Sequence, residues 1–275
     1  MAVAAPAAAR AIDAVIKLGG DVLDGDALAA VATDIARARP GRRFIIVHGG
    51  GAQATALAGR LGLQSHLVGG RRITDAPMLD VMKMIVAGRL NVDLVTALRA
   101  AGVPAIGLSG TSGVIRAHRR PPRVVSGAAE AVDFGLVGDV DDFDLALLAA
   151  LDAAAVVPVI ACLAAGAPGE VLNINADVVA SQLAAASGAA ALVACTAVGG
   201  VRADKDDPAT VLRRLTVAGA RAAIADGTVQ GGMIPKLEEA FAPLAAGVPA
   251  VHIVAPSEIA ASLAAPGSVG TLLVP

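Results

Sequence analysis

Short apolar runs alternate with longer amphipathic segments along most of the chain. Runs rich in Val, Ile and Leu predict buried strands at 14–18, 44–48, 103–108, 156–162, 171–174, 191–196, 250–254 and 271–274. Helical spacing of apolar positions predicts helices at 25–39, 52–61, 78–101, 141–154, 175–187, 231–246 and 257–264, with one or two short helices in 209–225. This alternation indicates an α/β protein with a mostly parallel sheet covered on both faces.

Two stretches interrupt the alternation. Residues 67–76 are rich in Gly and Arg and predict a loop or hairpin, and residues 114–140 predict β-hairpins. No internal repeat is visible, and a division into two lobes is expected near 170–190.

Composition narrows the class of protein. The 275 residues are 56% apolar but only 1% aromatic, and the formal net charge is −2. Aromatic stacking platforms and a long basic run are therefore lacking, which argues against a nucleic-acid partner. The Ala-rich runs are broken by Gly, Pro and charges too often for a membrane span. Residues 1–13 form an Ala-rich tail that we expect to be flexible and that lacks the pattern of a signal peptide. The two cysteines fit buried, reduced thiols of a cytoplasmic protein.

The most informative stretch is a strand that ends in three glycines. The apolar run 44–47 is followed by His48, Gly49, Gly50 and Gly51, and then by a predicted helix. Glycines let an anion approach the backbone closely, and the start of a helix adds partial positive charge. We interpret this turn as a seat for an anion, most simply a phosphoryl group, although a plain strand-to-helix turn has the same pattern.

The same glycines allow a rival interpretation. Gly49, Gly51 and Ala54 match the relaxed dinucleotide fingerprint, and Arg71 with Arg72 resembles a 2′-phosphate site. The acidic residue that this fingerprint requires at the tip of the next strand is not clearly present, since Asp75 falls in a loop. A nicotinamide-dependent oxidoreductase is therefore the weaker alternative.

Other polar residues fall at strand ends or helix starts. Lys17 ends an apolar strand beside Gly19 and Gly20, and a lysine there suits phosphate binding. Arg72 suits bidentate capture of a carboxylate. The run 173–177 places Asn173 and Asp177 at the end of a strand and in the first turn of a helix, which is where open α/β sheets bind ligands.

A second glycine turn lies near the C-terminal end. Residues 227–236 place glycines at a helix start and Lys236 in its first turns. The spacing differs from a Walker A loop, but the turn still offers amides and a cation to a polyphosphate.

Taken in chain order, these motifs resemble the amino acid kinase family, and within it the branch that acts on N-acetylglutamate. The matching stretches are 16–20, 47–51, 70–75, 88–91, 173–177, 231–236 and 270–271. The resemblance implies a three-layer αβα sandwich with an acceptor-binding and dimerisation lobe at 14–172 and an ATP-binding lobe at 173–275. It further implies that ATP, accompanied by Mg²⁺ with few or no protein ligands, phosphorylates the side-chain carboxylate of N-acetyl-L-glutamate in arginine biosynthesis.

The resemblance also implies roles for particular residues. Lys17 and Lys236 would neutralise the transferring phosphoryl group, and Asp177 would hold both lysines. The acceptor would be bound by Gly49, Gly50, Arg72 and Asn173. The nucleotide and its phosphates would contact Gly19, Gly20, Gly51, Thr196, Gly231, Gly232 and Met233. No residue is expected to serve as a dedicated metal ligand.

The chain departs from the family pattern at two places. Thr111 and Ser112 stand where a Lys-Asp or similar pair is usual, and Ala197 follows Thr196 where an Asp is usual. Two alternatives therefore stay open: a kinase for an aminoadipate derivative, N-acetylated or carrier-bound, and a non-catalytic sensor of the same fold. The segment 1–13 looks too short for the extra helix of arginine-inhibited hexamers, so we expect a homodimer without arginine inhibition.

Overall fold

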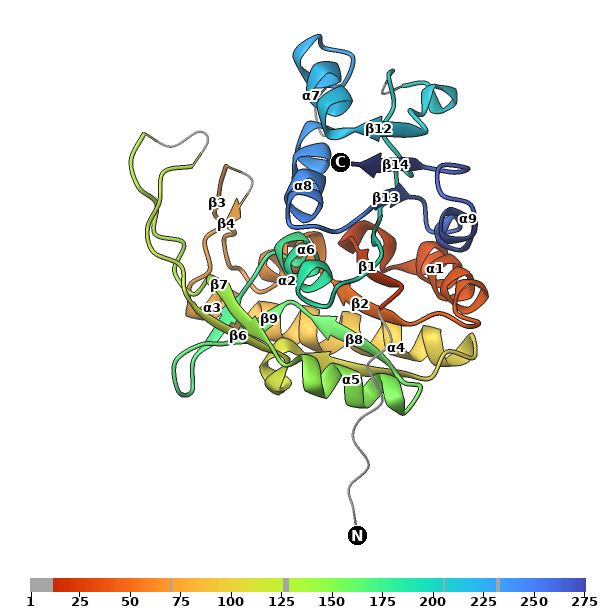
Figure 1. The fold of residues 1–275 in the computed structure, drawn as a ribbon. Coiled ribbons are helices and arrows are strands. Elements are labelled where there is room, and N and C mark those ends of the chain that lie inside the picture. Colours follow the sequence, from red (N-terminus) through yellow and green to blue (C-terminus); the bar gives the residue numbers. More distant parts are fainter. Residues whose placement is uncertain (1–11, 70, 126–128, 205, 231–232) are drawn as a thin grey trace.

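The computed structural model describes residues 12–69, 71–125, 129–204, 206–230 and 233–275. An eight-stranded sheet runs through the molecule in the order β12-β14-β13-β11-β1-β2-β8-β5 (Figure 1). Its strands are β1 Ala14–Leu18, β2 Phe44–His48, β5 Ala105–Ser109, β8 Val157–Ala161, β11 Leu192–Cys195, β12 Arg214–Thr216, β13 Val251–Val254 and β14 Thr271–Val274. The strands from β13 to β5 are parallel, whereas β14 pairs antiparallel with β13 and parallel with β12. The sheet is thus mixed and mostly parallel, as the sequence predicts.

Helices cover both faces of this sheet. On one side α1 packs against α4 and α9, and on the other α6 lies over β1 and beside α8 (Figure 1). The α-helices are α1 Gly25–Ala38, α2 Gly51–Arg60, α3 Ala76–Met82, α4 Asn91–Ala100, α5 Leu145–Ala153, α6 Ala176–Ala186, α7 Val217–Ala225, α8 Met233–Ala245 and α9 Ile259–Ala264. A π-helical segment, η2 Lys83–Leu90, joins α3 to α4, so the long helix predicted from the sequence is present. The remaining short helical segments are η1 Gly20–Val22, η3 Gly110–Val114 and η4 Pro208–Thr210.

A smaller sheet and a hairpin are formed by the part of the chain that precedes α6. The four-stranded sheet has the order β10-β9-β6-β7, with β6 Ile115–Arg119, β7 Gly138–Phe143, β9 Leu163–Ala165 and β10 Val171–Asn173. The hairpin pairs β3 Leu67–Val68 with β4 Arg71–Arg72. The hairpins predicted in 67–76 and 114–140 are therefore confirmed.

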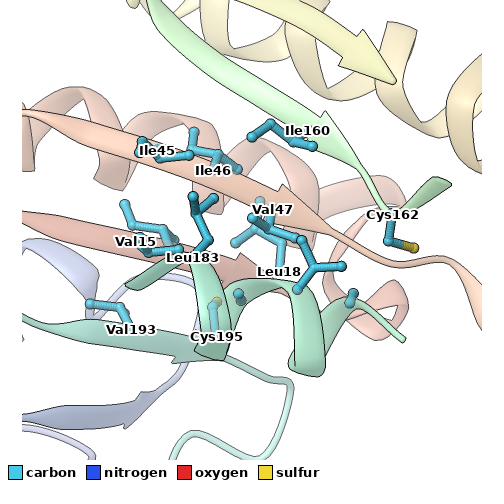
Figure 2. Packing of buried hydrophobic residues seen from close by; sticks show 14 of the residues in the cluster. Val15, Leu18, Ile45, Ile46, Val47, Ile160, Cys162, Leu183, Val193 and Cys195 are labelled. Atoms are coloured by element: carbon cyan, nitrogen blue, oxygen red, sulfur yellow. The ribbon is translucent and has the colours of Figure 1, made fainter. Parts of the chain in front are cut away.

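The core lies between the central strands and α6. The side chains of Val15, Ile46 and Val193 are completely or almost completely buried, and Leu183 of α6 packs over them (Figure 2). Because aromatic residues are scarce, branched aliphatic side chains fill this space at close-packed density. The rigid centre of the sheet fixes the positions of the loops that follow its strands.

The structure corrects two predicted elements. The helix predicted at 141–154 begins only at Leu145, because Asp141 and Asp142 belong to strand β7, and Asp144 caps the helix by accepting from the Leu147 N–H at 2.9 Å. Strand β12 was predicted as part of a helical stretch. Its sequence, Arg-Leu-Thr, is not apolar, and it is a strand because it pairs with β14 at the sheet edge.

Candidate active site

The candidate site lies where three parallel strands end. Lys17 lies near the end of β1, the glycine turn 49–51 follows β2, and Thr196 follows β11. Since β2, β1 and β11 are parallel neighbours, their carboxyl ends meet at one edge of the sheet. This edge is the usual ligand-binding position of open α/β sheets.

An ion pair forms the centre of the site. The Lys17 ammonium Nζ lies 2.6 Å from Oδ1 of Asp177, in the first turn of α6, and both side chains are largely buried. Asn175 caps α6 by accepting from the Asp177 N–H at 2.8 Å, which fixes the start of the helix. Burial alone would lower the pKa of Lys17, but the Asp177 charge and hydrogen bond raise it overall. Lys17 is therefore held as a cation.

The second lysine, Lys236, lines the same cavity and has no partner among the described residues. Lys17, Asp177, Thr196 and Lys236 line one cavity of about 270 Å³ whose inner wall is apolar. No described residue forms an ion pair or hydrogen bond with Lys236, and burial lowers its pKa. The structure thus brings together the three residues expected to converge, but Asp177 contacts Lys17 and acts on Lys236 only through its charge.

Two further features of this cavity are visible only in the structure. Glu239, one helical turn after Lys236, also lines it, and burial together with the Asp177 charge raises the pKa of Glu239 to about 7. Its only sequence signal was helical spacing from Lys236. Thr196 is 6% exposed, and its hydroxyl Oγ1 has no hydrogen-bond partner among the described residues.

The two glycine turns face each other. A Cβ atom on Gly20 would lie 3.3 Å from the Gly50 Cα, and one on Gly50 would collide with the Leu90 side chain. The Gly49 N–H is already engaged, because it donates to the Leu18 carbonyl at 3.2 Å. No described residue accepts from the Gly50 N–H or from the Gly20 N–H, so both amides are left for a ligand.

A buried histidine, His48, supports the glycine turn 49–51 after β2. His48 Nδ1 lies 3.0 Å from the Gly49 carbonyl, and Nε2 lies 2.9 Å from Nδ2 of Asn91. A carbonyl only accepts, so Nδ1 donates and Nε2 accepts from Asn91. Burial lowers the pKa of His48 to about 4, which keeps this neutral tautomer.

The expected acceptor-binding residues form a second group. Arg72 donates to the Gly51 carbonyl at 2.9 Å, to Thr55 Oγ1 at 2.7 Å and to Ser65 Oγ at 2.8 Å. Asn173 is 8% exposed and donates to the Thr74 hydroxyl at 3.1 Å. Arg72 is therefore fixed against the glycine turn of β2, and Asn173 is tied to the strand segment that carries Arg72.

The remaining motif residues are placed as follows. Met233 begins α8 and is buried, while Gly231 and Gly232 lie outside the described residues. Thr111 and Ser112 lie in the η3 turn after β5, where Thr111 Oγ1 donates to Ser109 Oγ at 2.8 Å. Asp75, which the dinucleotide interpretation would need at a strand tip, caps α3 instead by accepting from the Met78 N–H.

Comparison with known proteins identifies the class. The model of the amino acid kinase family matches residues 14–255. The chain belongs to this family. Its class is accordingly that of a phosphotransferase rather than of a dinucleotide-dependent oxidoreductase.

Relatives with high identity share one name. The chain is 54% identical over 267 residues to "Acetylglutamate kinase" of Sorangium cellulosum, covering 95% of this chain and 94% of that protein. It is 52% identical over 266 residues to "Acetylglutamate kinase" of Anaeromyxobacter dehalogenans, covering 94% and 98%.

Solved structures agree on the fold. The protein smu.665 of Streptococcus mutans superposes with a TM-score of 0.74 at 26% identity, covering 95% of this chain and 98% of that chain. N-acetylglutamate synthase of Neisseria gonorrhoeae, solved with coenzyme A and N-acetyl-glutamate, superposes with a TM-score of 0.81 at 23% identity, covering 97% and 60%.

Proposed function

We propose that this chain transfers the γ-phosphoryl group of ATP to the side-chain carboxylate of N-acetyl-L-glutamate, forming an acyl phosphate in arginine biosynthesis. The observation that carries this proposal is a cavity lined both by Lys17, which Asp177 holds, and by Lys236, which pairs with no described residue. The names of the relatives, at 51–54% identity over nearly the whole chain, supply the acceptor.

The chemistry requires positioning and positive charge more than covalent assistance. Charge spreads over the phosphoryl oxygens in the transition state, and preorganised donors stabilise it where it develops. Lys17 and Lys236 would supply two ammonium groups, and Gly20 and Gly50 would supply backbone N–H groups. A glutamate side chain, with a pKa of about 4.3, is already ionised at neutral pH, so no general base is needed.

The acceptor would lie along the second group of residues. The Arg72 guanidinium and the Asn173 amide would bind its α-carboxylate end, because a fixed guanidinium suits bidentate carboxylate recognition. The glycine turn after β2 lies between Arg72 and the lysine pair, so an acceptor bound there reaches from one to the other. Arg72 and the glycine turn 49–51 lie in the proposed acceptor-binding and dimerisation lobe, residues 14–172, and Asn173 stands at its boundary with the proposed ATP lobe, residues 173–275.

Mg²⁺ would enter with ATP. No cluster of three His, Cys, Asp or Glu side chains arranged for a metal occurs among the described residues. The lysines and amides present suit triphosphate oxygens, and Mg²⁺ is commonly held by such oxygens and water with few protein ligands. When bound, it would neutralise charge on the β- and γ-phosphates.

Assembly and location are part of the same proposal. Ile106 of the edge strand β5 and Val92 of α4 are large exposed hydrophobic residues, which supports a homodimer formed at this edge. In the described part of the chain, no helix combines the length and apolarity needed to cross a bilayer. Two buried free thiols, Cys162 and Cys195, suit the cytoplasm.

The test is acyl phosphate formation, trapped with hydroxylamine, from ATP and N-acetyl-L-glutamate. N-acetyl-aminoadipate serves as the competing acceptor, because the alternative substrate is longer by one methylene group. We expect a higher kcat/KM for N-acetyl-L-glutamate. A preference for the aminoadipate derivative would reassign the acceptor, and nucleotide binding without any trapped product would indicate a sensor. Light scattering in solution tests the dimer.

A further inference from the structure

The turn after β1 carries a carboxylate that reaches the end of β11. Asp21 lies in η1, and its Oδ2 accepts from the Ala197 N–H at 2.9 Å. Ala197 directly follows Thr196. The two residues are far apart in the chain, so this bond is a tertiary contact between two loops of the site.

The Asp21 carboxylate also packs against the Gly19–Gly20 turn. A Cβ atom on Gly19 would collide with Asp21 Oδ1, so the side chain occupies the space that glycine leaves free. The Gly19 N–H donates to the Cys195 carbonyl at 3.3 Å. Two contacts, one on each side of Thr196, therefore fasten the end of β11 to the turn after β1.

The other side of this turn is fastened as well. Gln53 of α2 donates to the Gly20 carbonyl and to Asp24, each at 2.6 Å, and Arg89 pairs with Asp24 at 2.8 Å. Gln53 thus holds the turn toward the β2 side, whereas Asp21 holds it toward the β11 side. Among these side-chain contacts, the Asp21 bond is the one that reaches the segment carrying Thr196.

The contacts that Gly19 and Asp21 make with the end of β11 position the Thr196 hydroxyl. Its hydroxyl is buried, has no partner among the described residues and lines the cavity that holds both lysines. An unpartnered buried hydroxyl is costly unless a ligand satisfies it. Burial acts to lower the pKa of Lys17 and of Lys236, and Asp21 is among the carboxylates whose charge opposes that effect. Asp21 therefore lies within electrostatic range of the two lysines and of any ligand that binds in their cavity.

We infer that Asp21 is a positioning residue for the nucleoside triphosphate, which holds Thr196 and the Gly19–Gly20 turn in the arrangement that binds the phosphates. This inference rests on the proposed function. The departure from the family pattern at Ala197 falls on the residue whose backbone N–H donates to this carboxylate.

Two substitutions separate the hydrogen bond from the charge. Asp21→Ala removes both, while Asp21→Asn keeps an oxygen that accepts from the Ala197 N–H. Asp26→Ala is the matched control, because Asp26 is an exposed carboxylate in the first turn of α1 and makes no hydrogen bond or ion pair with a described residue. Each variant is titrated calorimetrically with a non-hydrolysable ATP analogue, and hydrogen exchange is followed for the peptide that spans 195–199.

For Asp21→Ala we expect the Kd of the analogue to rise roughly 10-fold, in the range for loss of a charge-assisted hydrogen bond. Exchange at 195–199 should accelerate, and the KM for the acceptor should change less than about 2-fold, within the ±0.5 kcal/mol typical of distant substitutions. Asp21→Asn should keep the exchange protection and lose less affinity. Asp26→Ala should match the wild type in both readouts.

Unchanged affinity and unchanged exchange in Asp21→Ala would overturn the inference, as would equal losses in Asp21→Asn and Asp21→Ala. Failure of the proposed function is distinguishable, because it is measured as the absence of trapped acyl phosphate with the wild type, whereas the inference is measured by analogue affinity and hydrogen exchange. The exchange comparison needs no nucleotide and would still report whether Asp21 holds the end of β11.

Discussion

Lys17 and Asp177 form a 2.6 Å ion pair between the end of β1 and the first turn of α6, while Lys236 faces the same cavity without a described partner. The two lysines therefore differ in what they do for the fold, although both are proposed to bind the phosphoryl group. Substitutions that remove one charge at a time should separate these contributions.

Lys17→Met should lower stability as well as rate, because it leaves the Asp177 carboxylate unpaired. We expect a loss of about 1–3 kcal/mol in the free energy of unfolding and a fall of about 10²-fold or more in kcat. Lys236→Met should lower kcat to a similar extent with little change in stability, since burial already disfavours its charge. Urea denaturation and the hydroxylamine assay measure the two effects.

The control for this pair is Lys83→Met, which removes an exposed lysine that pairs with Asp80 on the surface. It should change stability by less than about 0.5 kcal/mol and leave kcat unchanged. Equal destabilisation by Lys17→Met and Lys236→Met would contradict the structural difference between the lysines.

Glu239→Gln should flatten the pH dependence of ATP binding near neutrality. Burial and the Asp177 charge raise the pKa of Glu239 to about 7, so its carboxylate ionises just where the enzyme would work. Above that pH the added negative charge opposes the phosphates, and the wild-type KM for ATP should rise, whereas the variant should show no such rise. Identical KM profiles between pH 6 and 8.5 would contradict this account.

The same group affects stability with a defined sign. An acid whose folded-state pKa is raised disfavours ionisation in the fold, so stability is highest below its ordinary pKa and falls as pH rises toward 7. Glu239→Gln should therefore stabilise the protein at pH 8 more than at pH 5. Thermal unfolding at the two pH values is the measurement.

His48 should make the fold sensitive to acid. Burial lowers its pKa to about 4, below the ordinary value, so stability is complete above about pH 6.5 and is lost as pH falls toward 4. A completely buried histidine with this shift contributes up to about 3 kcal/mol to that loss. His252, which burial shifts in the same direction to about 4, adds to it.

His48→Gln keeps a donor and an acceptor but cannot ionise, so its stability should depend less on pH between 6.5 and 4 than that of the wild type. Denaturation midpoints at pH 7.5 and 5 test this. A variant that loses stability in parallel with the wild type would show that other groups cause the acid sensitivity.

Arg72→Lys should weaken acceptor binding selectively. The guanidinium contacts Gly51, Thr55 and Ser65 at once, and an ammonium on a flexible stem cannot reproduce this fixed fork. We expect the KM for N-acetyl-L-glutamate to rise about 10-fold or more, equivalent to about 1.4 kcal/mol, with the Kd for an ATP analogue unchanged. A rise in both constants would place Arg72 in the nucleotide site instead.

The sequence predicted the parts of the fold that depend on local pattern. Strand β1 and its neighbour β2 are continuous apolar runs, and parallel buried strands have that signature. Strand β12 has no such run and depends on pairing with β14, and the acidic residues before Leu145 looked like a helix start although two of them lie on β7. Short elements at the edge of a sheet depend on tertiary contacts, so the local sequence of the element alone does not predict them.

In the candidate site, too, some residues were predicted from local sequence and others depend on tertiary contacts. Lys17, Asp177 and Lys236 were found because each lies at a strand end or helix start with neighbouring glycines or asparagines. Glu239 and Asp21 were not singled out, because their significance depends on which distant residues they meet. The burial of the Thr196 hydroxyl likewise appears only once β11 is packed against its neighbours.

The reactivity of the two buried thiols can be used to follow local opening of the core. Cys195 ends β11 and Cys162 directly follows β8, two strands of the same sheet, and burial raises the pKa of each to about 12 (Figure 2). Alkylating reagents consume only the exposed thiolate, so the intact protein should resist them. The rate of cysteine alkylation would then report how often the middle of the sheet opens. A bound nucleotide that stabilises this region should lower that rate.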